Sequence, residues 1–244
     1  MRNIKLVIQY DGTSYHGWQI QPGVPTIQGV LLEALRKITG EKAKVYAAAR
    51  TDSGVHARCQ VVSFETASSL LPKRMQCALN SLLPEDIVVV KASRVSDGFH
   101  ARYCARSRLY RYTMLNRKFR SPFSSGYCYF FPYAVDIDAM KDAAEFLVGE
   151  HDFSSFEARF GRREKSIRTI EKINIFSRAG FICTDIQANG FLTHMVRIVM
   201  GTLLDVGRGK TRPADIERIL EAKDRQKAGA TLPAKGLCLM KVTY

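Results

Sequence analysis

The segment from residue 48 to residue 57 places a carboxylate where it could do chemistry. It reads Ala-Ala-Arg-Thr-Asp-Ser-Gly-Val-His-Ala, and Asp52 lies at its centre. Gly54 permits backbone conformations that other residues avoid, and catalytic groups are often carried on loops held by a rigid scaffold. Arg50 lies two residues away, where a guanidinium keeps a carboxylate ionised and able to act as nucleophile or base. A plain turn is the alternative, because Thr-Asp-Ser-Gly is also typical turn sequence.

A second charged residue of interest is Arg197, which follows an apolar stretch expected to be helical. The apolar side chains before it are Phe191, Leu192, Met195 and Val196. An unpaired cation among apolar side chains is costly, so we expect Arg197 to point toward a carboxylate, with Asp52 the natural candidate. A position at a helix end or on the surface is the alternative.

The elements that must position these residues follow from hydrophobic periodicity. In the first half we expect two helices, at 27–38 and from Met75 to Leu82, and four strands, at 3–10, 43–48, 59–64 and 87–95. Thr26 and Gly40 are typical start and stop residues for the first helix. The order is β-α-β-β-α-β, and it places Asp52 in a loop between two short strands.

The second half repeats this order. We expect helices at 138–148 and 190–205, a short extra helix after Pro213, and strands at 109–115, 166–176, 181–187 and 237–243. Two such halves predict an α+β fold of two ferredoxin-like units packed side by side around a central cleft. We place the junction near Arg106, which gives an N-terminal domain of residues 1–105 with Asp52 and a C-terminal domain of residues 106–244 with Tyr110 and Arg197.

The charge balance indicates the class of partner. Lys and Arg total 37 against 23 acidic residues, a net charge of +14, and such a balance attracts polyanions such as nucleic acid or an anionic membrane. A merely basic surface is the alternative. The longest apolar stretches, such as 87–90, are too short to span a bilayer, and no apolar leader follows Met1. We therefore expect a cytoplasmic protein without a membrane partner.

Neither the cysteines nor the histidines indicate a metal site. The six cysteines are scattered without a C-x-x-C motif, so we expect reduced and mostly buried thiols. The five histidines lack metal-ligand spacing. Gly209-Lys210-Thr211 resembles the end of a P-loop, but the first glycine of that motif is replaced by Leu204. We expect no metal and no cofactor.

The segment at Arg50 belongs to a longer series of motifs. Arg50-Thr51-Asp52-Ser53-Gly54-Val55-His56-Ala57 resembles the R-T-D-x-G-V-H-A signature of the TruA family of tRNA pseudouridine synthases. The resemblance covers nearly the whole chain, through Tyr10-Asp11-Gly12-Thr13, Gly17-Trp18-Gln19, Leu79-Asn80, Leu83-Pro84, Phe99-His100-Ala101-Arg102, Arg108-Leu109-Tyr110-Arg111-Tyr112, His151-Asp152-Phe153, Ala188-Asn189-Gly190-Phe191-Leu192, Met195-Val196-Arg197, Gly236-Leu237 and Val242-Thr243-Tyr244. Each motif is weak alone, but their joint order and spacing are specific. The implied architecture is the pseudouridine synthase fold.

The resemblance implies a role for each matching residue. Asp52 corresponds to the essential aspartate, Arg197 to an arginine paired with it, and Arg50 to the arginine that helps to extrude the target nucleotide. Tyr110 corresponds to the tyrosine that stacks on the target base, although from the residues alone it is equally an ordinary aromatic on a strand. A uridine in a stem must leave the stack to react, and an aromatic face stabilises the extruded base.

The implied reaction is the isomerisation of uridine to pseudouridine at positions 38, 39 and 40 in the anticodon stem-loop of tRNA, carried out by a homodimer. We expect His56, Arg58 and Arg102 to bind the substrate. Asp52 either attacks the anomeric carbon, acts on the C2′ proton or adds to C6 of the base, and the residues do not choose among these routes. The chain departs from the family pattern at Ala47-Ala48-Ala49 and Ser53, where the small side chains predict that loop geometry is retained.

Basic residues gather in three groups that we expect to contact phosphates. They are Arg102, Arg106, Arg108 and Arg111 around Tyr110; Arg159, Arg162, Arg163, Lys165 and Arg168; and Arg208, Lys210 and Arg212. Such contacts give affinity and salt dependence without base specificity, and they suit recognition of a folded RNA by its shape. Solvated charge is the alternative for each group.

Two other classes of protein fit parts of this pattern. A non-catalytic RNA-binding protein, such as a tRNA chaperone, explains the charge but leaves Arg50 and Asp52 without a role. A metal-dependent RNA hydrolase needs a carboxylate cluster, whereas only one carboxylate is strongly placed here. Sensitivity to a chelator separates the hydrolase from the isomerase, and binding without reaction in Asp52→Asn separates an enzyme from a binding protein.

Overall fold

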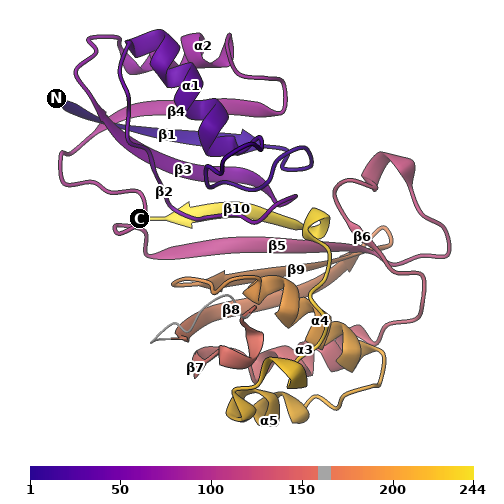
Figure 1. The fold of residues 1–244 in the computed structure, drawn as a ribbon. Coiled ribbons are helices and arrows are strands. Elements are labelled where there is room, and N and C mark those ends of the chain that lie inside the picture. Colours follow the sequence, from indigo (N-terminus) through magenta and orange to yellow (C-terminus); the bar gives the residue numbers. More distant parts are fainter. Residues whose placement is uncertain (159–165) are drawn as a thin grey trace. The chain divides into compact units, whose positions relative to one another are not determined.

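The computed structural model describes residues 1–158 and 166–244, which form the mixed α+β fold that the sequence predicts (Figure 1). The chain divides into two compact units. The first consists of Met1–Arg108 and Cys238–Tyr244, and the second of Leu109–Leu237. From the sequence we expected the closing strand in the second domain, whereas its residues 238–244 group with the first unit.

The first unit is built on a sheet with the strand order β4-β1-β3-β2, in which neighbouring strands are antiparallel. In a β-α-β-β-α-β chain this is the ferredoxin-like arrangement. The last strand of the chain also joins β3, in parallel, with Cys238 opposite His56. The strands are β1 (Arg2–Tyr10), β2 (Tyr46–Ala47), β3 (His56–Thr66), β4 (Ile87–Val95) and β10 (Leu237–Thr243).

Two helices complete the first unit. The first begins where the sequence predicts, and the second starts three residues before the predicted Met75 and ends two residues before the predicted Leu82. In α1 (Ile27–Thr39) the Thr26 side chain accepts a hydrogen bond from the Gly29 amide at 3.3 Å, and Gly40 ends the helix with a left-handed φ of 74°. The second helix, α2 (Pro72–Asn80), contacts both α1 and β4. Apolar side chains at alternate positions of β1 pack with the helices in a core that contains Ile4, Leu6, Ile8, Leu31, Leu35 and Met75.

The second unit has the strand order β5-β9-β8-β7, and the short β6 runs parallel to β5. Helix α3 contacts α4 and β8. The strands are β5 (Ser107–Leu115), β6 (Tyr129–Phe130), β7 (Gly149–Asp152), β8 (Ile167–Arg178) and β9 (Phe181–Ala188). The helices are α3 (Ile137–Glu145), α4 (Met195–Gly207) and α5 (Asp215–Ala222), with 3₁₀ turns at η1 (Pro122–Ser124), η2 (Ser154–Phe156), η3 (Arg225–Lys227) and η4 (Ala234–Gly236).

The start of α4 differs from the sequence prediction. The helix was expected over 190–205 but begins at Met195. Just before it, His194 adopts a left-handed φ of 61°, which interrupts helical geometry. Asn189 continues the pairing with β8 through two 3.1 Å hydrogen bonds with the backbone of Thr169, so the chain leaves the sheet later than hydrophobic periodicity suggests.

Other boundaries also differ. The strand predicted at 43–48 is reduced to the two residues of β2, whereas the strand predicted at 59–64 extends from His56 to Thr66. The helix predicted at 138–148 ends at Glu145. The short strands β6 and β7 were not predicted, because two and four residues are too few to show a periodic pattern.

The structure describes all six cysteines, and each is a free thiol. The expectation that they are mostly buried is wrong, since Cys77 and Cys104 are exposed and only Cys128 is buried.

Within residues 1–158 and 166–244, no helix combines the length and the apolar character that crossing a membrane requires.

Helix α4 packs closely against the chain that follows η3. A Cβ built on Gly201 would lie 1.8 Å from the carbonyl oxygen of Ala230, far inside van der Waals contact. The Gly229 amide donates to the Thr202 hydroxyl at 2.8 Å, and this hydroxyl donates to the Ile198 carbonyl at 2.9 Å. The position of α4 therefore depends on the absence of a side chain at residue 201.

We predict that Gly201→Ala lowers the free energy of unfolding by about 1–3 kcal/mol, because the added methyl group must displace backbone. Urea denaturation measures the change. Gly98→Ala is the matched control, since a Cβ at Gly98 meets nothing within 4 Å and its φ is not left-handed. Equal stability of the two variants would contradict this account of the packing.

Candidate active site

Asp52 lies in the connection between β2 and β3, which we call the Asp52 loop and define as residues 48–55. The Asp52 residue is half-buried and Arg50 is exposed. The Val55 amide donates to the Asp52 carbonyl at 3.2 Å, and Gly54 has a left-handed φ of 76°. The loop thus contains a turn, which the sequence offered as the alternative to a catalytic role, and Asp52 within it is partly exposed.

A second segment, residues 11–18, braces the Asp52 loop through backbone contacts. The amide of Trp18 donates to the Thr51 carbonyl at 3.0 Å. The Tyr15 carbonyl accepts from the Gly54 amide at 3.3 Å and from the Ser53 hydroxyl at 3.2 Å. Hydrogen bonds therefore fix the backbone on both sides of Asp52.

Two glycines allow this bracing segment to approach the Asp52 loop closely. A Cβ on Gly12 would lie 2.1 Å from the Val55 carbonyl oxygen, and one on Gly17 would lie 2.7 Å from the Thr51 carbonyl oxygen. Gly17 also has a left-handed φ of 87°. Any other residue at these positions would push the two segments apart.

A buried polar network lies beneath the Asp52 loop. The side-chain amide of Gln60, which is fully buried, accepts from the Ala49 amide at 3.3 Å and donates to the Ala49 carbonyl at 2.8 Å. The same amide lies 3.4 Å from the Tyr10 hydroxyl, which is 2.8 Å from the Thr51 hydroxyl. Burial raises the pKa of Tyr10 far above its usual value. The network holds the residues on either side of Arg50.

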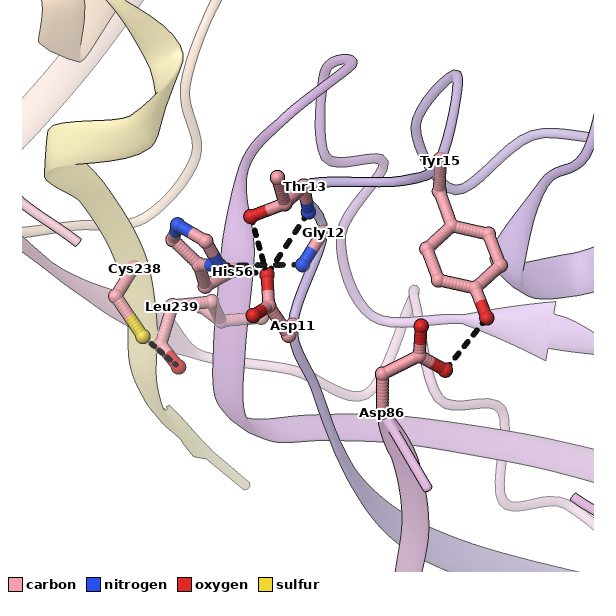
Figure 2. Close-up of polar contacts among 8 residues, drawn as sticks. All are labelled: Asp11, Gly12, Thr13, Tyr15, His56, Asp86, Cys238 and Leu239. Atoms are coloured by element: carbon pink, nitrogen blue, oxygen red, sulfur yellow. Dashed lines mark hydrogen bonds and ion pairs between the residues drawn. The ribbon is translucent and has the colours of Figure 1, made fainter. Parts of the chain in front are cut away.

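Tyr15 is itself held by an acidic residue just before β4. Its hydroxyl donates to Asp86 Oδ1 at 2.6 Å (Figure 2). Burial and this hydrogen bond raise the pKa of the Tyr15 hydroxyl, so it stays protonated and remains a donor. The Asp86 carbonyl accepts from the Asp11 amide at 2.9 Å. Asp86 therefore binds the bracing segment at two places, the backbone of Asp11 and the side chain of Tyr15.

His56, expected to bind the substrate, is buried at the start of β3 with 6% of its surface exposed. Its Nδ1 accepts from the Gly12 amide at 3.1 Å, and Asp11 Oδ1 lies 3.1 Å from the same nitrogen (Figure 2). The two contacts require different states of Nδ1, because it accepts from Gly12 only without a proton and donates to Asp11 only with one. Asp11 Oδ1 also accepts from the amide of Thr13 at 2.9 Å and from its hydroxyl at 2.6 Å. These contacts tie His56 to the bracing segment.

Arg108 also supports the Asp52 loop. Its Nη2 donates to the carbonyls of Ala48 at 3.1 Å and Arg102 at 2.9 Å, and its Nη1 donates to the Ala105 carbonyl at 3.1 Å. This guanidinium therefore binds three backbone carbonyls from two stretches of the chain, a role that its place in a basic group did not indicate. Arg102 and Arg58 are both exposed.

In the second unit, Tyr110 lies on β5 with 6% of its surface exposed. The ring of Phe191 meets it edge-on, with the ring centroids 5.1 Å apart. This is a favourable aromatic geometry that fixes the Tyr110 ring. The proposed stacking of Tyr110 on a base stays a prediction.

Arg197 lies in the first turn of α4 and is half-buried. Its Nε donates to the carbonyl of Leu232 at 2.7 Å, and the Leu232 amide donates back to the Arg197 carbonyl at 3.2 Å. The first bond holds the guanidinium at its Nε, and the second joins the backbone of the helix to that of Leu232. The pairing of Arg197 with Asp52 stays a prediction.

Carboxylates neutralise several of the basic residues expected to contact RNA. Arg111 forms a two-point ion pair with Asp185, with nitrogen–oxygen distances of 2.6 and 2.7 Å. Arg208 and Lys210 lie 3.6 and 3.8 Å from the single carboxylate of Asp205, which balances only one of the two positive charges. Their contribution to phosphate binding is correspondingly reduced.

Two further basic residues also have partners within the fold. Arg212 pairs with Asp215 at 2.9 Å. Arg168 donates to the backbone carbonyl of Ile167 at 2.6 Å. The other members of that group lie outside the described residues: Arg159, Arg162, Arg163 and Lys165.

Sequence reasoning missed the residues that hold the Asp52 loop in place. Gln60 carries a signal, because it is a polar residue followed by the apolar pair Val61-Val62 on a strand. Asp86 and the bonding of Tyr15 carry none, because their contacts join residues 71 positions apart. The structure places the half-buried residue Asp52 on a loop that is hydrogen-bonded on both sides, two residues from the exposed Arg50. A carboxylate held in this way suits nucleophilic or base chemistry.

Comparison with known proteins gives the class of protein. A family profile described as tRNA pseudouridine synthase matches residues 6–104 and 143–244. The chain belongs to this family, whose members are isomerases.

Individual relatives resemble the chain over its whole length. The tRNA pseudouridine synthase A of Thermoanaerobacter sp. (strain X514) is 48% identical over 244 residues, which is 100% of both chains. The tRNA pseudouridine synthase A 2 of Clostridium perfringens is 45% identical over 100% of both. The tRNA pseudouridine synthase A of Moorella thermoacetica is 44% identical over 99% of both. The similarity places the chain in the TruA family.

We predict that Tyr10→Phe lowers the free energy of unfolding by about 1–3 kcal/mol, because the side chains of Thr51 and Gln60 each lose the Tyr10 hydroxyl as a hydrogen-bond partner. Urea denaturation near neutral pH measures the loss. Tyr46→Phe is the control, because Tyr46 is 36% exposed, and we expect it to change stability by less than about 0.5 kcal/mol.

The pH dependence of stability, compared between wild type and Tyr10→Phe, tests the same network. Because the pKa of Tyr10 is raised in the fold, the folded chain keeps this proton above about pH 10, where an unfolded tyrosine loses it. The associated stability is complete below about pH 10 and is lost as the pH rises further. The difference in the free energy of unfolding between wild type and Tyr10→Phe should therefore narrow above about pH 10. A difference that stays constant with pH would contradict the buried network.

Proposed function

We propose that the chain isomerises uridine to pseudouridine at positions 38, 39 and 40 in the anticodon stem-loop of tRNA, with Asp52 as the nucleophile. Full-length similarity to relatives named tRNA pseudouridine synthase A supports the reaction and the substrate class. One observation carries the assignment of Asp52: this half-buried residue lies on a loop that hydrogen bonds fix on both sides, two positions from the exposed Arg50.

The proposed reaction exchanges one bond for another within the same nucleotide. The bond from C1′ to N1 of uracil breaks, the base turns, and a bond from C1′ to C5 forms. C5 loses its proton and N1 gains one, so the product is an isomer of the substrate. An ionised carboxylate serves this exchange through C1′, through the C2′ proton or through C6, and the reaction as written consumes no cofactor.

We assign the remaining roles as the motifs indicate. Arg50 helps to extrude the nucleotide, which is compatible with its exposure. Tyr110 stacks on the extruded base. Arg197 pairs with the Asp52 carboxylate.

Three further residues were expected to bind the substrate. Arg58 and Arg102 are exposed cations in the same unit as Asp52, which supports phosphate contacts. The burial of His56 and its bonds to the bracing segment favour an indirect role, in which it positions the Asp52 loop. We also propose that the protein acts as a homodimer in the cytoplasm.

We predict that Asp52→Asn abolishes reaction while tRNA binding is retained. The assay follows tritium release from unmodified tRNA transcripts labelled at C5 of uridine, with EDTA present throughout. Wild type should release about one equivalent for each target uridine, and the variant should be slower by about a thousandfold or more. Asp142→Asn, on an exposed residue of α3, is the matched control and should react normally.

Each alternative gives a different result. Binding by a folded wild type without tritium release would favour the RNA-binding protein. Loss of wild-type activity in EDTA, with recovery on adding a divalent cation, would favour metal-dependent chemistry. Substantial release by Asp52→Asn would refute the role given to Asp52. Transcripts with uridine replaced singly at positions 38, 39 and 40 test which of them react.

A further inference from the structure

The connection between β5 and α3 displays a group of exposed aromatic rings. We call residues 116–133 the aromatic segment. Its exposed rings are Phe123 at 94%, Phe119 at 71%, Tyr133 at 68% and Tyr127 at 55%. Single exposed apolar side chains are ordinary on a protein surface, but four large rings within one short segment indicate a surface that binds something.

The charge of this segment is of one sign. Residues 98–135 contain neither aspartate nor glutamate. Within the aromatic segment Arg117, Lys118 and Arg120 are all exposed. Two of these cations lie near rings: Lys118 Nζ is 5.3 Å from the centroid of Phe119, and Arg120 Cζ is 5.9 Å from that of Phe130. Exposed rings and positive charges are therefore interleaved along one segment of the chain.

Hydrogen bonds hold the backbone that carries these rings. The side-chain amide of Asn116 donates to the carbonyls of Phe131 at 2.8 Å and Tyr133 at 2.7 Å, which closes the segment at its base. Next to η1, the Tyr127 amide donates to the Ser124 carbonyl at 3.0 Å. A surface with an ordered backbone loses less conformational entropy when a ligand binds.

The two stretches that match the family profile do not include this segment. The profile covers residues 6–104 and 143–244 and leaves residues 105–142 unmatched. None of the residues assigned above to Asp52 chemistry, extrusion or base stacking belongs to residues 116–133. The aromatic segment is thus unexplained by the reaction itself.

We propose that the aromatic segment binds unpaired bases of the substrate tRNA, a contact surface additional to the Asp52 loop; this rests on the proposed function. Exposed rings stack on any base, and neighbouring cations bind the phosphates between bases. A second copy of the chain fits less well, because a symmetric contact would bring the same acid-free, basic surface against itself.

The test separates stacking from apolar contact by replacing rings with an apolar side chain that has no aromatic face. The double variant Phe119→Leu/Phe123→Leu is compared with wild type for binding of an unmodified tRNA transcript, by fluorescence anisotropy. We expect the variant to bind about fivefold or more weakly. We also expect KM for tritium release to rise by a similar factor, with kcat unchanged.

Two further variants control this measurement. Val88→Ala/Val90→Ala removes apolar side chains that are each 40% exposed on β4, and it should leave tRNA affinity unchanged. Arg117→Gln/Lys118→Gln removes two charges from the segment. The logarithm of the binding constant should then fall less steeply with the logarithm of salt concentration, by up to roughly 0.7 for each phosphate that the variant no longer neutralises.

Three outcomes would overturn the inference. If the leucine variant binds within twofold of wild type while wild type releases tritium, the aromatic segment does not bind RNA and the proposed function stands. If wild type neither binds nor reacts, both proposals fail. If Phe119→Ala/Phe123→Ala abolishes a dimer in sedimentation velocity without weakening tRNA binding per chain, the surface is instead a contact between copies.

Discussion

The geometry around Asp52 depends on one buried side-chain amide, that of Gln60. A buried amide or carbonyl without a partner costs free energy. Both the backbone amide and the backbone carbonyl of Ala49 bind the side chain of Gln60. The side chain satisfies both groups only when its amide faces that residue in one orientation. The direction in which the chain passes Arg50 is thereby fixed. The Tyr10 hydroxyl extends the constraint to Thr51, the residue immediately before the carboxylate.

The bracing segment supplies the second half of this constraint. Its contacts with the Asp52 loop are mostly backbone to backbone, and they require glycine at two positions where a Cβ would meet a carbonyl oxygen. A carboxylate that acts on one atom of an extruded nucleotide needs a backbone held in a fixed position, because a small displacement of the catalytic group lowers the rate by a large factor. Gly12 and Gly17 are therefore as necessary to the proposed site as Asp52 itself. Their role is to let two loops approach closely enough to share hydrogen bonds.

The sequence predicts what is local or periodic and misses what is neither. Alternation gave the long strands, and Thr26 and Gly40 marked the ends of α1 because capping acts over a few residues. The strands β6 and β7 are too short for any pattern. The start of α4 depends on a left-handed His194 and on pairing with β8, which involves distant residues. The family resemblance predicts roles for Asp52 and Arg50, whereas the support that Gln60 and Arg108 give to the loop depends on contacts 11 and 60 residues away.

Net charge overstates how much of this chain is available to a polyanion. The formal value is +14, yet Arg111 and Arg212 each face a carboxylate and Arg108 is committed to backbone carbonyls. Such cations release few counterions when RNA binds, because they are already compensated or fully hydrogen-bonded within the fold. The salt dependence of tRNA binding should therefore reflect the exposed arginines and lysines, such as Arg50 and Lys118, instead of the total. Where rings accompany those cations, affinity gains a contribution from stacking that salt does not screen.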